Sequence, residues 1–153
     1  MSPRQRRIQR ILEHRQKELD DRAGVLAAVR AREAAAVAEA DAADTAARDA
    51  ADARRKLAET GSDVLGFLEA EEWLVSTARR AERAWAFVAS LRREVEKAQA
   101  VVIQARTKLK QAEQLAARVA LTERRLDDRR ERRRDDEASA RIAQRKAAVA
   151  RKQ

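Results

Sequence analysis

One four-residue segment, Thr60-Gly61-Ser62-Asp63, is the strong break between two long runs of helix-forming residues. Glycine adopts the left-handed conformation that often ends a helix, so Gly61 can end the first helix, and Ser62 or Asp63 can cap the second. The 153-residue chain otherwise has only two glycines, and its one proline is at position 3. We therefore expect two long helices, over 3–60 and 63–150, joined by a turn over 60–66.

The composition supports helices and argues against a globular core. Ala, Arg, Glu, Leu, Lys and Asp dominate, whereas the chain has two Phe, two Trp and no Tyr. Such a composition with periodic apolar positions is typical of long helices and coiled coils. We predict an all-α protein, a single elongated domain over 1–153 in which two long helices form an antiparallel coiled-coil hairpin, the second helix being longer than the first.

Apolar residues recur at alternating spacings of four and three along both predicted helices, as they do along a coiled-coil seam. The seam residues of the first helix are Ile8, Leu12, Leu19, Leu26, Val29, Ala36, Ala40, Ala43, Ala47, Ala50 and Leu57. Those of the second are Leu74, Ala81, Ala84, Val88, Leu91, Val95, Ala98, Val102, Ala105, Leu109, Ala112, Ala116 and Val119.

The pattern leaves the register between the two helices open. A fold centred on residue 62 places large residues opposite small ones, for example Leu26 opposite Ala98 and Ala36 opposite Val88. A shift by one heptad also gives sensible pairs, such as Leu57 with Leu74. The seam alone does not choose between these registers.

The N-terminus has the features of a helix start rather than of a targeting peptide. Ser2 can cap the helix, Pro3 fits its first position, and Gln5 can complete a capping box. The basic start lacks the apolar region of a signal peptide, and no apolar run reaches the ~20 residues that span a bilayer. With no cysteine in the chain, we expect a soluble, cytoplasmic protein without a transmembrane segment.

The net charge of +9 is unevenly distributed, since both ends of the chain are basic and the middle is mildly acidic. The segment 126–137, "LDDRRERRRDDE", contains six carboxylates and five arginines in short runs of one to three. Opposite charges four residues apart stabilise an exposed helix by about 0.2–0.5 kcal/mol per pair, so this segment supports its own helix. We interpret the segment as a solvated helical face or as a protein-docking helix, because its carboxylates disfavour nucleic acid, which a run of cations would bind better.

The chain offers no chemistry for catalysis or for cofactor binding. His14 is the one histidine, and no nucleophile, carboxylate pair or second ligand accompanies it in the sequence. The three glycines form no phosphate-binding loop. We expect no enzymatic activity, no metal, no cofactor and no small-molecule substrate.

All four aromatic residues, Phe67, Trp73, Trp85 and Phe87, follow the turn within 21 residues. One interpretation is that they cover the turn as part of the core. The other is that some are exposed anchors for a partner, because Trp is enriched at binding hot spots. Leu68 would join either surface.

The arrangement resembles the FliJ/YscO-type central stalk proteins of flagellar and virulence type III secretion systems. The resemblance rests on a short two-helix chain with "RRIQRILEHRQKELDD" near its N-terminus, "FLEAEEW" after the break and "LTERRLDDRRERRRDDEASARIAQRK" towards its C-terminus. It implies a non-enzymatic stalk whose end with both termini inserts into the pore of a hexameric secretion ATPase, while the hairpin end faces the export gate. Some members of the family also handle substrate chaperones.

This resemblance implies two docking regions at the cytosolic face of the secretion apparatus. The ATPase would contact the basic end of the hairpin through Arg4, Arg6, Arg7, Arg10, Arg124, Arg125, Arg129, Arg130, Arg132, Arg133 and Arg134. The gate would contact the turn through Phe67, Leu68 and Trp73.

Two other functions remain open from the residues alone. A basic coiled coil can bind nucleic acid, and its affinity would then fall steeply with salt concentration. An alanine-rich seam can also form between chains as readily as within one, which would make the protein a homo-oligomeric structural coiled coil.

Overall fold

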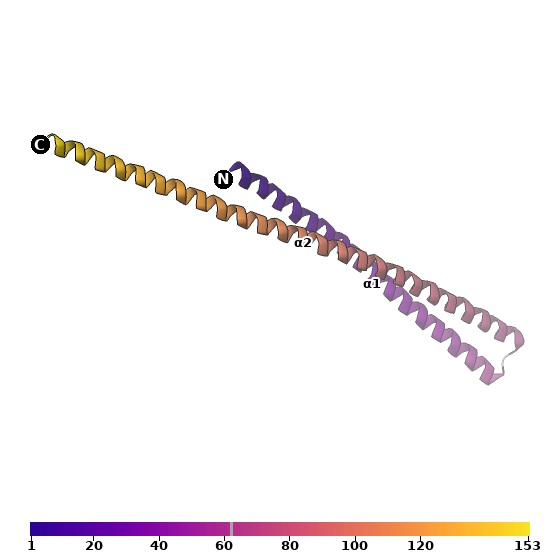
Figure 1. Cartoon of the computed structure of the whole chain (residues 1–153). Helices are drawn as coiled ribbons and strands as arrows, with labels where there is room; N and C mark the ends of the chain where they lie inside the picture. Colours follow the sequence, from indigo (N-terminus) through magenta and orange to yellow (C-terminus); the bar gives the residue numbers. More distant parts are fainter. Residues whose placement is uncertain (62) are drawn as a thin grey trace. The chain divides into compact units, whose positions relative to one another are not determined.

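The structure, a computed structural model, describes residues 1–61 and 63–153. Two α-helices account for nearly all of them, α1 (Pro3–Thr60) and α2 (Val64–Arg151) (Figure 1). The predicted all-α fold with two helices, the second one longer, is confirmed. The chain divides into two compact units, of which unit 1 comprises Met1–Lys17 and Thr107–Gln153, and unit 2 comprises Glu18–Arg106.

The start of α1 carries the predicted capping box. The Ser2 hydroxyl accepts a hydrogen bond from the Gln5 backbone N–H at 3.1 Å, and the Gln5 side chain accepts one from the Ser2 backbone N–H at 2.7 Å. These two bonds satisfy donors that a helix N-terminus leaves without partners. The capping box therefore holds α1 helical from Pro3 onward.

The chain reverses after Thr60. Gly61 has a φ of +72°, the left-handed conformation that glycine adopts without steric strain. The Asp63 carboxylate accepts a hydrogen bond from the Gly66 backbone N–H at 3.0 Å, and its carbonyl accepts one from Phe67 N–H at 3.1 Å. Asp63 is thus the N-cap of α2, while the other candidate cap, Ser62, lies outside the described residues.

In unit 2 the two helices pack through small and branched apolar residues. Ala40 and Val88 are fully buried and form one cluster with Ala36 and Leu91. A second cluster contains Leu26, Val95 and Val102, with Leu19, Val29 and Ala98 packed against it. Across the whole chain, every residue predicted for the two seams is buried or half-buried.

Polar bonds across unit 2 show which register the two helices adopt. Arg32 bonds Glu94 at 3.4 Å and Arg92 bonds Glu33 at 3.3 Å. The residue numbers of each bonded pair add up to 126 or 125, as a fold centred on residues 62–63 requires. A shift by one heptad would place these charges opposite other residues. The register centred on the turn is therefore the observed one.

In unit 1 the first turns of α1 pack on the middle of α2. Ile8, Ala112 and Val119 are buried there, and the Ser2 hydroxyl donates a hydrogen bond to the Glu123 carboxylate at 3.2 Å. Beyond this contact α2 continues alone (Figure 1). All residues of the segment 124–153, which we call the overhang, are exposed.

Candidate protein-docking surfaces

The basic docking region predicted from the sequence lies within unit 1. Arg4, Arg6, Arg7 and Arg10 are exposed on the first turns of α1, and the seven other predicted arginines are exposed on α2 from Arg124 onward. The bond between Ser2 and Glu123 joins the start of α1 to the residue that precedes the overhang. The structure therefore places the two groups of arginines on either side of the contact between Ser2 and Glu123, in the middle of unit 1.

Within the described residues, ten of these eleven arginines have no ion pair. Among residues 1–61 and 63–153, the one docking arginine with an ion pair is Arg130, which bonds Asp127 at 3.2 Å. This pair is three residues apart on a solvent-exposed helix, where such pairs contribute little to stability. The remaining guanidinium groups are available to carboxylates of another molecule.

The overhang contains ten arginines and two lysines against six carboxylates, a net charge of +6. Arg125, Arg129, Arg132 and Arg133 have the spacing i, i+4, i+7 and i+8, so they project from one side. Asp127, Glu131 and Asp135 have the spacing i, i+4 and i+8 and project from a different side. Asp136, four residues after Arg132, projects from the same side as these arginines, so acidic and basic side chains are mixed around the helix over 126–137, and the excess of positive charge belongs to the overhang as a whole.

A small apolar pocket adjoins the basic residues. It has a volume of about 230 Å³ and is lined by Met1, Gln5, Ile8, Gln9, Leu12, Ala116 and Val119. Its position between α1 and α2 near the chain start places apolar surface beside the exposed arginines. Such a combination suits protein contact, in which an apolar centre is surrounded by charged residues.

The three residues predicted to face the gate differ in exposure. Leu68 and Trp73 are 57% and 47% exposed. Phe67 is half-buried, because the Arg54 guanidinium lies 5.4 Å from its ring centroid while also pairing with Glu71. Leu68 and Trp73 are thus accessible to a partner, and Phe67 is partly covered by its own chain.

The aromatic cluster divides between the two interpretations offered by the sequence. Trp85 packs against the core cluster of unit 2 and donates a hydrogen bond from its ring nitrogen to Asp44 at 2.9 Å. Phe87 is 50% exposed, like Trp73.

Sequence reasoning left out Val64 and Leu65, which are 77% and 65% exposed in the first turn of α2. The sequence did indicate this exposure, because both residues precede Leu74, the first residue of the predicted seam of the second helix.

The comparisons with known proteins identify the family. The family model for the flagellar FliJ protein matches residues 4–148, which include most of both helices and all of the residues predicted for docking. The chain belongs to the FliJ family. No curated protein and no solved structure matches it. As a FliJ-family member the chain is a component of the flagellar export apparatus, and the resemblance inferred from its sequence is confirmed.

The remaining sequence predictions concern His14, metal binding and membrane spans. His14 is exposed on α1. In the described ranges, no group of His, Cys, Asp or Glu side chains is arranged to hold a metal ion. No described helix is long and apolar enough to cross a membrane. The FliJ family is a family of structural export-apparatus proteins, and the surfaces described above are suited to binding.

Proposed function

We propose that the chain is the central stalk of a type III flagellar export apparatus, working at the cytosolic face of the membrane. The end of unit 1 with both chain termini inserts into the hexameric export ATPase, and the turn end of unit 2 meets the cytosolic domain of the export gate. The observation that carries the proposal is the overhang, a helix of exposed residues with a net charge of +6. A helix of this kind can enter a pore lined by carboxylates, where complementary charge orients it.

The apolar residues at the turn support the second contact. Leu68 and Trp73 both expose apolar surface on α2, and Leu68 lies next to the exposed Val64 and Leu65, four and three residues before it. Residues of this kind form the buried centre of protein interfaces, and aromatic side chains contribute most. In the proposed function, Leu68 and Trp73 bind the gate while the arginines bind the ATPase. The stalk then couples the gate to the ATPase without catalysing a reaction of its own.

The test of ATPase docking is ATP hydrolysis by the purified export ATPase of the same organism, with and without the full chain, in excess competitor DNA. We expect stimulation that is lost when residues 124–153 are deleted. The triple charge reversal Arg125→Glu, Arg129→Glu and Arg132→Glu should reduce it strongly. The matched control, Arg141→Glu, Arg145→Glu and Lys146→Glu, makes the same charge change outside the docking set and should preserve it.

Other outcomes would replace the proposal. Equal losses from both triple reversals would show that only net charge matters, and that 124–134 is no docking segment. Absence of stimulation together with DNA binding that weakens steeply with salt would assign the chain to nucleic-acid binding. Helical circular dichroism of each variant checks that the overhang stays folded.

Gate binding is tested with the purified cytosolic domain of the export gate. We expect Leu68→Ser combined with Trp73→Ser to weaken binding, because both changes remove exposed apolar surface. The control Val75→Ser removes an apolar side chain that is 42% exposed further along α2 and should preserve binding. Unchanged affinity of the double variant would remove the gate assignment.

A further inference from the structure

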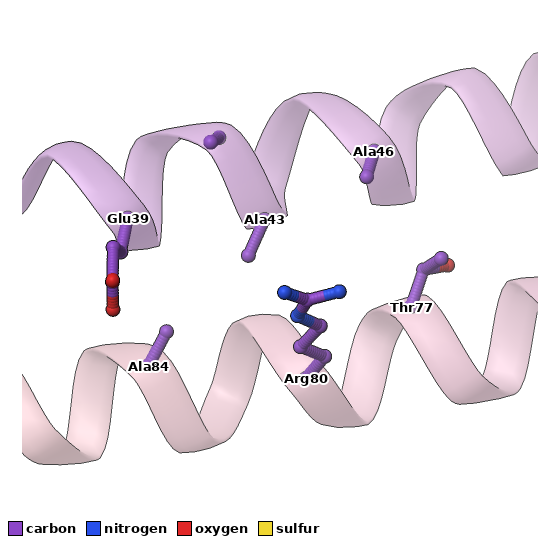
Figure 2. Close-up of a pocket in the computed structure, with 7 residues that line it drawn as sticks. Glu39, Ala43, Ala46, Thr77, Arg80 and Ala84 are labelled. Atoms are coloured by element: carbon purple, nitrogen blue, oxygen red, sulfur yellow. The ribbon is translucent and has the colours of Figure 1, made fainter.

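Two concave surfaces of the molecule differ in the charges that line them. The helices of unit 2 leave a groove of about 360 Å³. Figure 2 shows that this groove contains both signs of charge, since Glu39 lies on α1 while the Arg80 guanidinium on α2 points towards α1. The other surface is a hollow of about 320 Å³ near the end of α2, lined by Arg145, Lys146, Val149, Ala150 and Gln153. Both charged residues of this hollow are cations, so it favours an anionic partner.

The positive charge of the overhang is concentrated in its last part. Residues 124–137 contain seven arginines and six carboxylates, a net charge of +1. Residues 138–153, which we call the basic segment, contain three arginines, two lysines and no carboxylate side chain, a side-chain charge of +5. In the part of the chain that the structure describes, none of these five cations has an ion pair. The basic segment therefore carries most of the excess charge, and this charge is available to another molecule.

Four of the five cations share one side of the helix with the two large apolar side chains of the basic segment. These six residues have the spacing i, i+1, i+4, i+5, i+8 and i+11, and they are Arg141, Ile142, Arg145, Lys146, Val149 and Lys152. With about 100° between successive residues, they fall within an arc of about 140°. Ile142 and Val149, which are 56% and 61% exposed, lie in the middle of this arc, with cations on both sides of them. The basic segment is thus a basic amphipathic helix.

The surface of an anionic bilayer complements this arrangement. A helix that lies on a membrane places its apolar side chains at the boundary between headgroups and acyl chains, while Lys and Arg beside them reach the lipid phosphates. Arg145 and Lys146 lie on either side of Val149, so one headgroup phosphate at the hollow would meet two cations. The basic segment is helical up to Arg151, and its many Ala, Arg and Lys residues favour that state. Binding therefore requires little ordering of the backbone.

Other anionic partners fit the basic segment less well. The backbone of a nucleic acid offers phosphates to the cations but no apolar surface to cover Ile142 and Val149. A protein groove that binds a helix takes apolar anchors at about four positions, whereas the basic segment has two large ones. We propose that residues 138–153 form a peripheral membrane-binding helix that recognises anionic lipid headgroups. The four cations of its amphipathic side contact the headgroups, and Ile142 and Val149 enter the lipid surface.

This inference goes beyond the proposed stalk function and does not depend on it. The docking arginines end at Arg134, and the basic segment begins at Ala138. A helix enclosed by an ATPase ring cannot lie on a bilayer at the same time, so membrane binding belongs to the chain before it joins the ATPase. Binding to lipid and stimulation of the ATPase are therefore separate measurements.

The test is cosedimentation of the full chain with vesicles of phosphatidylglycerol and phosphatidylcholine, compared with vesicles of phosphatidylcholine alone. We expect binding to the anionic vesicles alone, and weaker binding as the salt concentration rises. The triple reversal Arg141→Glu, Arg145→Glu and Lys146→Glu should lower the affinity by about 100-fold or more, because each cation near an anionic surface contributes roughly fivefold. Ile142→Ser combined with Val149→Ser should lower it by roughly tenfold, since both changes remove apolar surface.

The matched control is the triple reversal Arg125→Glu, Arg129→Glu and Arg132→Glu, which makes the same charge change in the docking part of the overhang. This control should keep vesicle binding and lose ATPase stimulation. The triple reversal in the basic segment should do the opposite. The two variants together therefore distinguish a failure of this inference from a failure of the proposed function.

Three outcomes would overturn the inference. The first is no binding to anionic vesicles, or equal binding to neutral ones. The second is an equal loss from both triple reversals, which would show that net charge and not the basic segment decides binding. The third is a basic-segment variant that keeps vesicle binding but loses binding to duplex DNA or to the purified gate domain, which would assign the segment to that partner. Circular dichroism of each variant checks that the overhang stays helical.

Discussion

Two stretches of α2 with similar helix-forming residues differ in what covers them. From Val88 to Val102 in unit 2, every third or fourth residue is buried or half-buried against α1. From Arg124 to Gln153 in unit 1, every residue is exposed. Helical structure in the first stretch is supported by tertiary packing, and in the second by intrinsic propensity and pairs such as Arg130 with Asp127. Stability and surface for binding are therefore concentrated in different stretches of one helix.

The largest effect should come from removing a buried side chain of the packed stretch. Leu91 is 1% exposed and contacts the Ala36–Val88 cluster, so Leu91→Ala leaves a cavity and should lower the free energy of unfolding by about 2–4 kcal/mol. Leu126, in the overhang, is 40% exposed, and Leu126→Ala should cost less than about 0.5 kcal/mol. Urea denaturation followed by circular dichroism measures both. Equal losses would contradict the contrast between the two stretches.

Substitutions of the two tryptophans should differ by a smaller amount in the free energy of unfolding. Trp85→Phe removes the hydrogen bond to Asp44 and should lower the free energy of unfolding by about 1 kcal/mol. Trp73 is 47% exposed, and Trp73→Phe should change the free energy of unfolding by less than about 0.5 kcal/mol. Thermal and urea unfolding of the two variants are compared directly. A larger loss for Trp73→Phe would mean that Trp73 is the structural residue.

The two helix caps should differ in the extent of their effect. Asp63→Ala removes the cap of α2 next to the hairpin turn, and we expect a loss of about 1 kcal/mol in the free energy of unfolding. Ser2→Ala removes the cap of α1 at the chain end, where the first turns can fray while the rest stays folded. Amide hydrogen exchange should show the Ser2→Ala effect confined to the first turns. Global loss of protection in that variant would contradict this expectation.

The smallest effect on stability should come from deleting the overhang, although this change removes the most residues. Removing 124–153 leaves Glu123 and its bond with Ser2 in place and exposes no buried residue. The free energy of unfolding should change by less than about 0.5 kcal/mol, while the helical signal falls with the residues removed. A strongly destabilised truncated chain would show that the overhang contributes to the fold.

Much of the fold could be predicted because helical patterns are local. The seam residues, the capping box of Ser2 and Gln5, and the turn at Gly61 each depend on spacings of a few residues. The exposure of the aromatic residues could not be predicted in this way. Trp85 and Phe87 are two residues apart, yet one bonds Asp44 on α1 and the other is half exposed.

By itself, the sequence determined two long helices, their seams, the place of the turn and an uneven distribution of charge. These properties follow from propensity and periodicity, which act over one or two helical turns. Only the tertiary structure shows the register, in which Arg32 bonds Glu94 and Arg92 bonds Glu33. The physical reason is that apolar spacing repeats every heptad, so the pattern of each helix fits several registers, and the choice depends on how residues far apart in the chain pack against each other.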